Sequence, residues 1–161
     1  MIEEVQDRVI SILGTYINTE LTALASPVGG VALALPKPSR YMLAFDPKST
    51  VLAAGDYPFC AVLPSKTELS DQLSRGIQVS NEHELAIVFL LIDQNIEYLN
   101  RLKSRYAKSA VIVLKKHQQT DPLRRVRINK IVYDRNLRDE RNSSYLGSVW
   151  ILVTCWEREV L

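Results

Sequence analysis

Residues 84–116 read ELAIVFLLIDQNIEYLNRLKSRYAKSAVIVLKK, and this stretch decides the fold. Its first part, from Glu84 to Ile92, is an almost unbroken apolar run, which is typical of a strand buried on both faces in the middle of a sheet. Asp93 can cap a following helix, because its carboxylate accepts the free amide hydrogens of the first turn. That helix should end near Lys116. Its expected buried stripe is Ile96, Leu99, Lys103, Tyr106, Ala110 and Val113 or Leu114, with Leu102 at the margin and Arg101, Arg105 and Lys108 on the polar face.

The N-terminal residues predict a second long helix, over 2–24. Apolar residues recur there at steps of three or four, which places them on one stripe of a helix. Carboxylates in the first turns favour the positive end of the helix dipole. Pro27 and the pair Gly29-Gly30 favour a turn and should end the helix. The stripe consists of Ile2, Val5, Val9, Leu13, Ile17, Leu21 and Leu24.

The rest of the chain carries shorter β signals. We expect short strands at 31–35 and 41–45, joined by Pro36-Lys37-Pro38, and longer strands at 57–63, 124–134 and 148–157. Residues 26–56 and 65–83 are less regular and are interpreted as loop or arm segments, 65–83 as a mobile polar connection. The apolar side chains of 26–56 need a cover, which is either this domain or another subunit.

This order of elements predicts an α+β fold. The natural packing is an antiparallel or mixed β-sheet with the two long helices packed on one face. The 161 residues fit a single domain, and the balance of 47% hydrophobic and 24% charged residues is that of an ordinary globular protein.

Targeting signals and membrane spans are not expected. The first residues, Met1 to Val5, lack the basic and apolar regions of a secretory signal, and the run 85–92 is far shorter than the roughly 20 residues of a spanning helix. Cys60 and Cys155 lie far apart in apolar runs and are interpreted as buried thiols. We expect a chain made in the cytosol, with no membrane contact.

No catalytic, cofactor or metal constellation is recognisable. The two histidines, His83 and His117, stand outside any nucleophile or metal motif, and Gly29-Gly30 is not followed by the lysine and hydroxyl of a phosphate loop. The pair Asp139-Glu140 is typical of a solvated loop. The sequence therefore favours a protein that is not an enzyme and works through its surfaces.

The charge distribution is the feature that remains. Residues 1–100 carry six Lys or Arg against twelve Asp or Glu, whereas residues 101–141 carry thirteen against four. Along 124–130, charged and apolar residues alternate, so Arg125, Arg127 and Asn129 should project from one face of a strand while Val126 and Ile128 enter the core. The candidate interface residues of this basic ridge are Arg124, Arg125, Arg127, Arg135, Arg138 and Arg141.

Three interpretations of the ridge stay open at this point. It is an ordinary solvated edge that discourages unwanted strand pairing, a surface for an acidic protein partner, or a surface near passing DNA. A dedicated sequence-reading module is not indicated, because helix-turn-helix and zinc-finger spacings are absent from the sequence.

The whole layout resembles phage tail terminator and neck (head-tail joining) proteins. The resemblance runs over residues 1–161. It rests on the long N-terminal helix, the Tyr57-Pro58 strand, the strand 84–92 leading into a helix with Leu99, Tyr106, Ala107 and Leu114, and the final pair of strands.

The resemblance implies a single tail-terminator-like α/β domain and a structural role in the virion. It implies a homo-oligomer, commonly a hexameric ring, that caps the tail tube in the tail-neck region and contacts the tube protein and the head-connector or neck proteins. Assembly would occur in the host cytoplasm, and DNA would pass nearby. The alternative is a small nucleic-acid-binding or regulatory module that uses the 124–141 ridge.

Overall fold

Six strands form one mixed sheet within residues 1–27, 29–44, 54–74, 78–140 and 143–160, the part of the chain that the computed structural model describes. The order across the sheet is β1-β2-β3-β6-β4, and β5 pairs with β6. β1 is parallel to β2, and the other pairs are antiparallel. The strands are β1 (Tyr41–Met42), β2 (Phe59–Ser74), β3 (Gln78–Asp93), β4 (Leu123–Tyr133), β5 (Leu137–Asp139) and β6 (Ser144–Val160).

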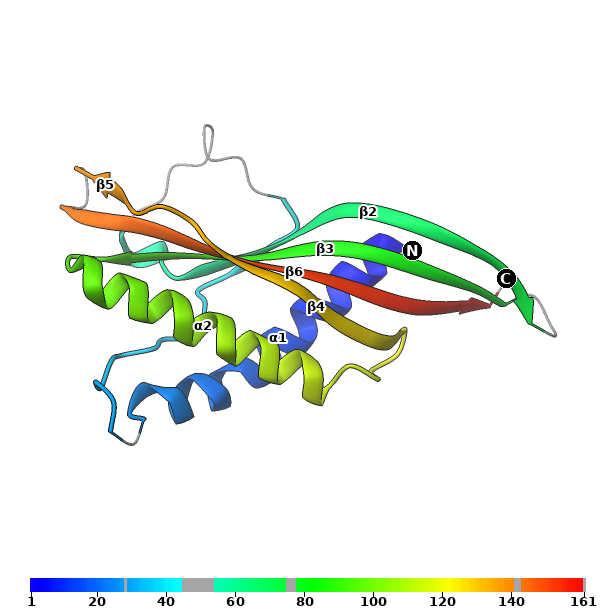
Figure 1. Cartoon of the computed structure of the whole chain (residues 1–161), viewed down its shortest axis with the longest axis horizontal. Helices are drawn as coiled ribbons and strands as arrows, with labels where there is room; N and C mark the ends of the chain where they lie inside the picture. The colour runs from blue at the N-terminus through cyan, green and yellow to red at the C-terminus, as the bar shows by residue number, and fades with distance from the viewer. Residues whose placement is uncertain (28, 45–53, 75–77, 141–142, 161) are drawn as a thin grey trace.

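Two long helices, α1 (Ile2–Ala25) and α2 (Ile96–Lys116), pack against each other and on one face of this sheet (Figure 1). A single turn of 3-10 helix, η1 (Ala54–Asp56), precedes β2. The predicted α+β fold with both helices on one face is thus confirmed. Among the helices of the described residues, none combines the length and the apolar character that crossing a membrane requires.

The core lies between the sheet and the helices. The predicted stripe of α1 is buried from Val5 to Leu21, with Ile2 and Leu24 partly buried at its ends. In α2, Lys103 and Tyr106 are buried as expected, whereas Ile96 is exposed. The strands supply the other wall, because successive residues of a strand point to opposite sides and every second side chain faces the helices. These inward residues include Leu85, Ile87, Phe89 and Leu91 of β3 and Val149, Ile151, Val153 and Cys155 of β6.

The interpretation of residues 65–83 as a mobile polar connection is wrong. β2 runs to Ser74 and β3 begins at Gln78, so nearly the whole stretch is antiparallel strand. β2, β3 and β6 continue past the ends of both helices (Figure 1). Where no helix covers a strand, neither face needs apolar residues, so the alternation that signals a half-buried strand is lost.

The segment 26–56 departs from its prediction in a different way. Among the described residues of this segment, only β1 forms a strand, and residues 31–35 run beside the helices without sheet pairing. Their backbone is held by helix side chains, since the Tyr106 hydroxyl donates to the Pro36 carbonyl and the Arg105 guanidinium donates to the Val31 carbonyl. Leu35 is buried in the core, so in this part the domain provides the cover. Of the expected strand 41–45, Tyr41 and Met42 form β1, and residue 45 lies outside the described residues. Residues 46–53 of the following connection also lie outside them.

The cap of α2 is also shifted. Asn95, and not Asp93, is the N-cap, and its side-chain oxygen accepts the backbone N–H groups of Glu97 and Tyr98 at 2.9 and 3.2 Å. Asp93 instead belongs to the end of β3 and accepts the Asn95 N–H. The helix ends at Lys116 as predicted.

Candidate functional site

Neither helix covers the face of the sheet that lies opposite them (Figure 1). On it lie the residues of β6 that alternate with the buried ones, namely Trp150, Leu152, Thr154 and Trp156. Its centre is apolar, because the small side chains Ala61, Ala86 and Val88 are buried there among larger, half-exposed ones. The larger members are Met42, Leu63, Leu90, Trp150 and Leu152.

Toward the far ends of β2, β3 and β6 the same face becomes charged. Strand register aligns Glu82 with Trp156 and Trp156 with Arg125, and the next row aligns Glu84, Thr154 and Arg127. Each row therefore runs from an acidic residue on β3 to a basic residue on β4, with a neutral residue on β6 between them. Neighbouring strands are about 4.8 Å apart, so the backbone of the two charged strands is separated by roughly 10 Å.

The basic end of these rows is a pair of arginines stacked on one indole. The guanidinium carbons of Arg125 and Arg127 lie 5.2 and 5.3 Å from the centre of the Trp156 ring, within the range of cation–π attraction. Arg127 Nε also donates to Asn129 Oδ1 at 2.9 Å, and Asn129 Nδ2 donates to Thr154 Oγ1 at 2.7 Å. The two exposed arginines are thus held on the uncovered face, with their remaining N–H groups available to an acceptor.

We call Arg125, Arg127 and Lys130 of β4 the basic strip. Lys130 belongs to the same face, because it pairs with Leu152 across a β-bulge at Asn129. All three strip residues are exposed. The predicted alternation of Arg125, Arg127 and Asn129 against buried Val126 is confirmed.

We call Glu68 of β2 and Glu82 and Glu84 of β3 the acidic strip, which surrounds Lys66. Lys66 forms an ion pair with Glu68, and that carboxylate, followed by the charges of Glu84 and Glu82, raises the pKa of the lysine. The register joins Glu68 to Glu82 and Lys66 to Glu84, so the four side chains share one face. With three carboxylates and one ammonium, the group carries a net charge of −2.

The other ridge arginines do not join the basic strip. Arg124 stands at a register shift and reaches Asp121 at 3.6 Å. Arg138 of β5 lies over the ring of Tyr145, 5.0 Å from its centre, on the side that packs toward the main core. Arg135 is exposed between β4 and β5, and Arg141 lies outside the described residues. The single ridge expected over 124–141 is therefore divided by the strand register, and the interface role of these arginines stays a prediction.

A shallow apolar depression continues the uncovered face toward β5. It is lined by Val132, Asp134, Trp150 and Leu152. Beyond it, the side chain of Leu137, which pairs with Leu146 of β6, is 64% exposed. The uncovered face thus combines an apolar half with a charged half, which is the composition of a protein contact surface.

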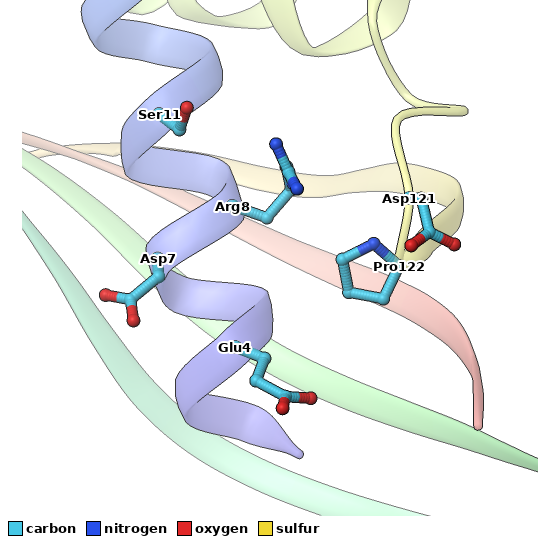
Figure 2. Close-up of a pocket in the computed structure, with 6 residues that line it drawn as sticks. All are labelled: Glu4, Asp7, Arg8, Ser11, Asp121 and Pro122. Atoms are coloured by element: carbon cyan, nitrogen blue, oxygen red, sulfur yellow. The ribbon is translucent and has the colours of Figure 1, made fainter. Parts of the chain in front are cut away.

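A polar cleft lies on the other side of the molecule, between the first turns of α1 and the loop before β4 (Figure 2). In it, the Arg8 side chain extends from the helix into the cleft opposite Asp121 and Pro122, and Arg8 Nε has no hydrogen-bond partner among the described residues. Glu4, Asp7 and Ser11 complete the lining. The lining contains neither histidine nor cysteine, and the described residues contain no group of three or more metal-ligating side chains.

A buried polar network lies among the extended strands, on their helix-side face. His83 and Glu157 are 1% and 2% exposed, and His83 Nε2 is 2.5 Å from Glu157 Oε1. Thr67 Oγ1 lies 2.9 Å from His83 Nδ1, and the Met1 ammonium donates to Glu157 at 2.6 Å. Burial raises the pKa of Glu157, but hydrogen bonds from Met1, His83 and Asn81 outweigh it, so the pKa lies below its usual value. The network joins β2, β3 and β6 and contributes to holding them in register.

Sequence reasoning missed Trp156, the acidic strip and this network. Glu82 and Glu84 do alternate ahead of the apolar run 85–92, and that alternation would have placed them on one face of a longer strand. The proximity of Trp156 to Arg125 depends on the pairing of β4 with β6, for which the sequence carries no local signal.

No protein-family model matches the chain, and no curated protein matches its sequence. Among solved structures, it is similar to a chain described as "Virion of native gene transfer agent (GTA) particle". The two are 16% identical, and the alignment covers 90% of this chain and 93% of that chain with a TM-score of 0.33. At this identity and TM-score, we draw nothing from the likeness about what this chain does.

Proposed function

We propose that this chain is a non-enzymatic structural subunit of a phage-like virion, which forms a ring in the tail-neck region as a tail terminator or neck protein. In this role it caps the tail tube and joins it to the head connector, after assembly in the host cytoplasm. The order of elements along the sequence, which resembles that family, supports the proposal.

The observation that carries the proposal is the unequal charge of the two borders of the uncovered face. The basic strip lies on β4, and the acidic strip lies on β2 and β3 at the opposite border. A subunit that meets its neighbours head to tail needs two different, complementary surfaces, whereas a twofold dimer needs one self-complementary surface. The apolar half of the same face supplies further area for contact with a tube or connector protein.

The mass of the purified protein in solution tests the ring. A hexamer of the 18.3 kDa chain has a mass of about 110 kDa, which light scattering after size-exclusion chromatography separates clearly from a monomer. Negative-stain electron microscopy of the same fraction should show closed rings. Adding the protein to polymerising tail tube protein from the same particle should stop tube growth and give shorter tubes than the tube protein alone.

A nucleic-acid-binding module is the second candidate, because exposed guanidiniums beside an indole also suit phosphate and base contacts. It predicts a monomer whose affinity for DNA falls steeply as salt rises. A monomer with that salt dependence, and with no effect on tube length, would replace the structural proposal by this one.

A further inference from the structure

We infer that the uncovered face also pairs with itself: two copies of the chain stack face to face about a twofold axis that runs along β6. This inference rests on the proposed function, because the dimer occupies the same two strips that the ring would use. It gives the proposed subunit a second, closed state that competes with assembly into a ring.

The strand order makes this arrangement possible. β3 and β4 lie on either side of β6, and neighbouring strands are about 4.8 Å apart. A twofold axis above β6 and parallel to it exchanges the two sides of the sheet but leaves positions along the strands unchanged. β3 of one copy then lies over β4 of the other, row for row, and β6 lies over β6. The strands of the two sheets stay aligned, as in ordinary sheet-on-sheet packing.

This symmetry brings acidic residues of β3 to basic residues of the other copy. The register places Glu82 and Arg125 in one row, and Glu84 and Arg127 in the next. In the dimer, Glu82 therefore lies over Arg125 of the second copy, and Glu84 lies over Arg127. Stacked sheets are about 10 Å apart, a distance that a glutamate and an arginine side chain span together. Each of these pairs forms twice, because the axis relates the two copies equally.

The apolar half of the face follows the same symmetry. Trp150 and Leu152 of β6 lie on the axis, so each faces its own copy. Beside them, Val88 of β3 and Val132 of β4 share a row and meet across the dimer. Trp150 and Leu152 are half-buried in the single chain, and covering them supplies stabilisation that exposed ion pairs alone do not.

The size of the contact indicates a reversible dimer. Three strands over the nine residues from Glu82 to Leu90 cover roughly 14 Å by 30 Å, or about 400 Å² per copy. A standard stable interface buries about 800 Å² per partner, and transient contacts bury less. The dimer should therefore dissociate readily, so that a ring neighbour or a tube protein that binds the strips displaces it.

A cysteine on the axis distinguishes the dimer from a head-to-tail contact. In the dimer, Leu152 faces Leu152 of the second copy, whereas in a cyclic ring the same residue of two neighbours lies one subunit repeat apart. Leu152→Cys treated with a short, reducible bismaleimide should give a covalent dimer of about 37 kDa, twice the 18.3 kDa of the chain. Thr15→Cys is the matched control and should give none, because Thr15 is exposed on α1, on the other side of the sheet. The unmodified chain should give none either, because Cys60 and Cys155 are buried.

Charge reversal tests the facing rows. One variant carries Arg125→Glu and Arg127→Glu, a second carries Glu82→Lys and Glu84→Lys, and a third carries all four changes. Each of the first two should raise the dissociation constant of the dimer about tenfold or more, because like charges then face each other. The four-change variant and an equimolar mixture of the first two should recover the dimer. Circular dichroism checks each fold, and light scattering over a range of concentrations measures the mass.

A control with Arg124→Glu and Arg138→Glu changes the net charge by the same amount as the first variant. These two arginines lie outside the facing rows, so the control should dimerise like the unmodified chain. Dimerisation of the unmodified chain should weaken as salt rises. If the first two variants dimerise as tightly as the unmodified chain, the pairing of the charged rows is overturned.

The outcomes separate the dimer from the ring. If Leu152→Cys gives no more covalent dimer than Thr15→Cys while the chain forms rings, the dimer is overturned and the ring stands. If the covalent dimer forms and the chain gives no rings and does not shorten tubes, the ring is overturned and the dimer stands. If both form, the cross-linked protein should enter rings only after the linker is reduced. Rings of cross-linked protein would overturn the competition between the two states.

Discussion

Replacing Leu13 with Ala should cost about 3–4 kcal/mol of the free energy of unfolding. Leu13 lies in the middle of the buried stripe of α1 and is fully buried. Removing three carbons forfeits about 2 kcal/mol of transfer free energy, at about 0.8 kcal/mol for each buried methylene group. The remainder comes from the cavity, which α2 and the sheet on either side of α1 can fill only in part.

Thermal and urea unfolding, followed by circular dichroism at one protein concentration, measure this loss. In a chain of 161 residues, a loss of that size lowers Tm by about 6–16 °C, since 1 kcal/mol corresponds to about 2–4 °C. Thr15→Ala is the matched control, because Thr15 is exposed on the same helix, and it should change stability by less than about 0.5 kcal/mol. Equal midpoints for Leu13→Ala and Thr15→Ala would refute the packing of α1 described above.

Three further predictions concern single buried groups. Glu157→Gln should lower stability by about 2 kcal/mol at pH 7, since charge-assisted hydrogen bonds are lost. Folding lowers the pKa of Glu157, so its stabilisation is complete above the usual pKa of 4.5 and is lost as the pH falls through the folded-state pKa. In urea unfolding at a series of pH values, the stabilities of the variant and the parent should therefore converge as the pH falls below 4.5. Cys60 and Cys155 should resist thiol reagents in the native protein and react in urea, since burial raises both pKa values, that of Cys155 to about 12. Gly147→Ala should destabilise by about 1–3 kcal/mol in thermal unfolding, because the added carbon would lie 2.5 Å from the buried Lys103 side chain.

Much of the fold could be predicted because two kinds of periodicity are strong in this sequence. The stripe from Val5 to Leu21 recurs at helical spacing, and the run from Leu85 to Ile92 is too apolar for any place but a buried strand. The α1 signal arises from burial in the core between the helices and the sheet, whereas the run of β3 is apolar on both faces because Ala86 and Val88 are buried in the cluster on the uncovered face. They therefore locate the elements that lie under or within the helical layer, and they end where that layer ends.

The parts of β2 and β3 that continue past the helices could not be predicted from periodicity, for the same physical reason. Residues 66–68 and 82–84 lie at the end of the helical layer, where one face of the strands carries charged residues and the other carries His83, which is buried in a polar network and not in apolar packing. Hydrogen bonding to the neighbouring strands satisfies the backbone there whatever the side chains are. Sequence periodicity reports burial rather than pairing, so a strand of this kind reads as a loop.

The candidate site could be predicted only on its basic side. The alternation of Arg125 and Arg127 with Val126 indicates a charged strand face within a few residues of sequence. The acidic strip lies on the same sheet face as these arginines only because β6 pairs with both β3 and β4. Those pairings join residues more than 25 positions apart in the sequence. An uneven charge along the sequence therefore suggested two surfaces, and the strand register was needed to place them on one sheet face.

The buried network and the charged strips occupy opposite faces of the same part of the sheet, so the network bears on which face the charged residues take. His83 pairs with Cys155 in the ladder, one residue from the pairing of Glu82 with Trp156. Thr67, His83 and Glu157 link β2, β3 and β6 beside the first turn of α1, where the N-cap residue Met1 also donates to Glu157. A slip of one residue in any of these strands would turn its charged residues to the other face. The network thus contributes the register that keeps the basic strip and the acidic strip on one face of the sheet, through hydrogen bonds and not through apolar packing.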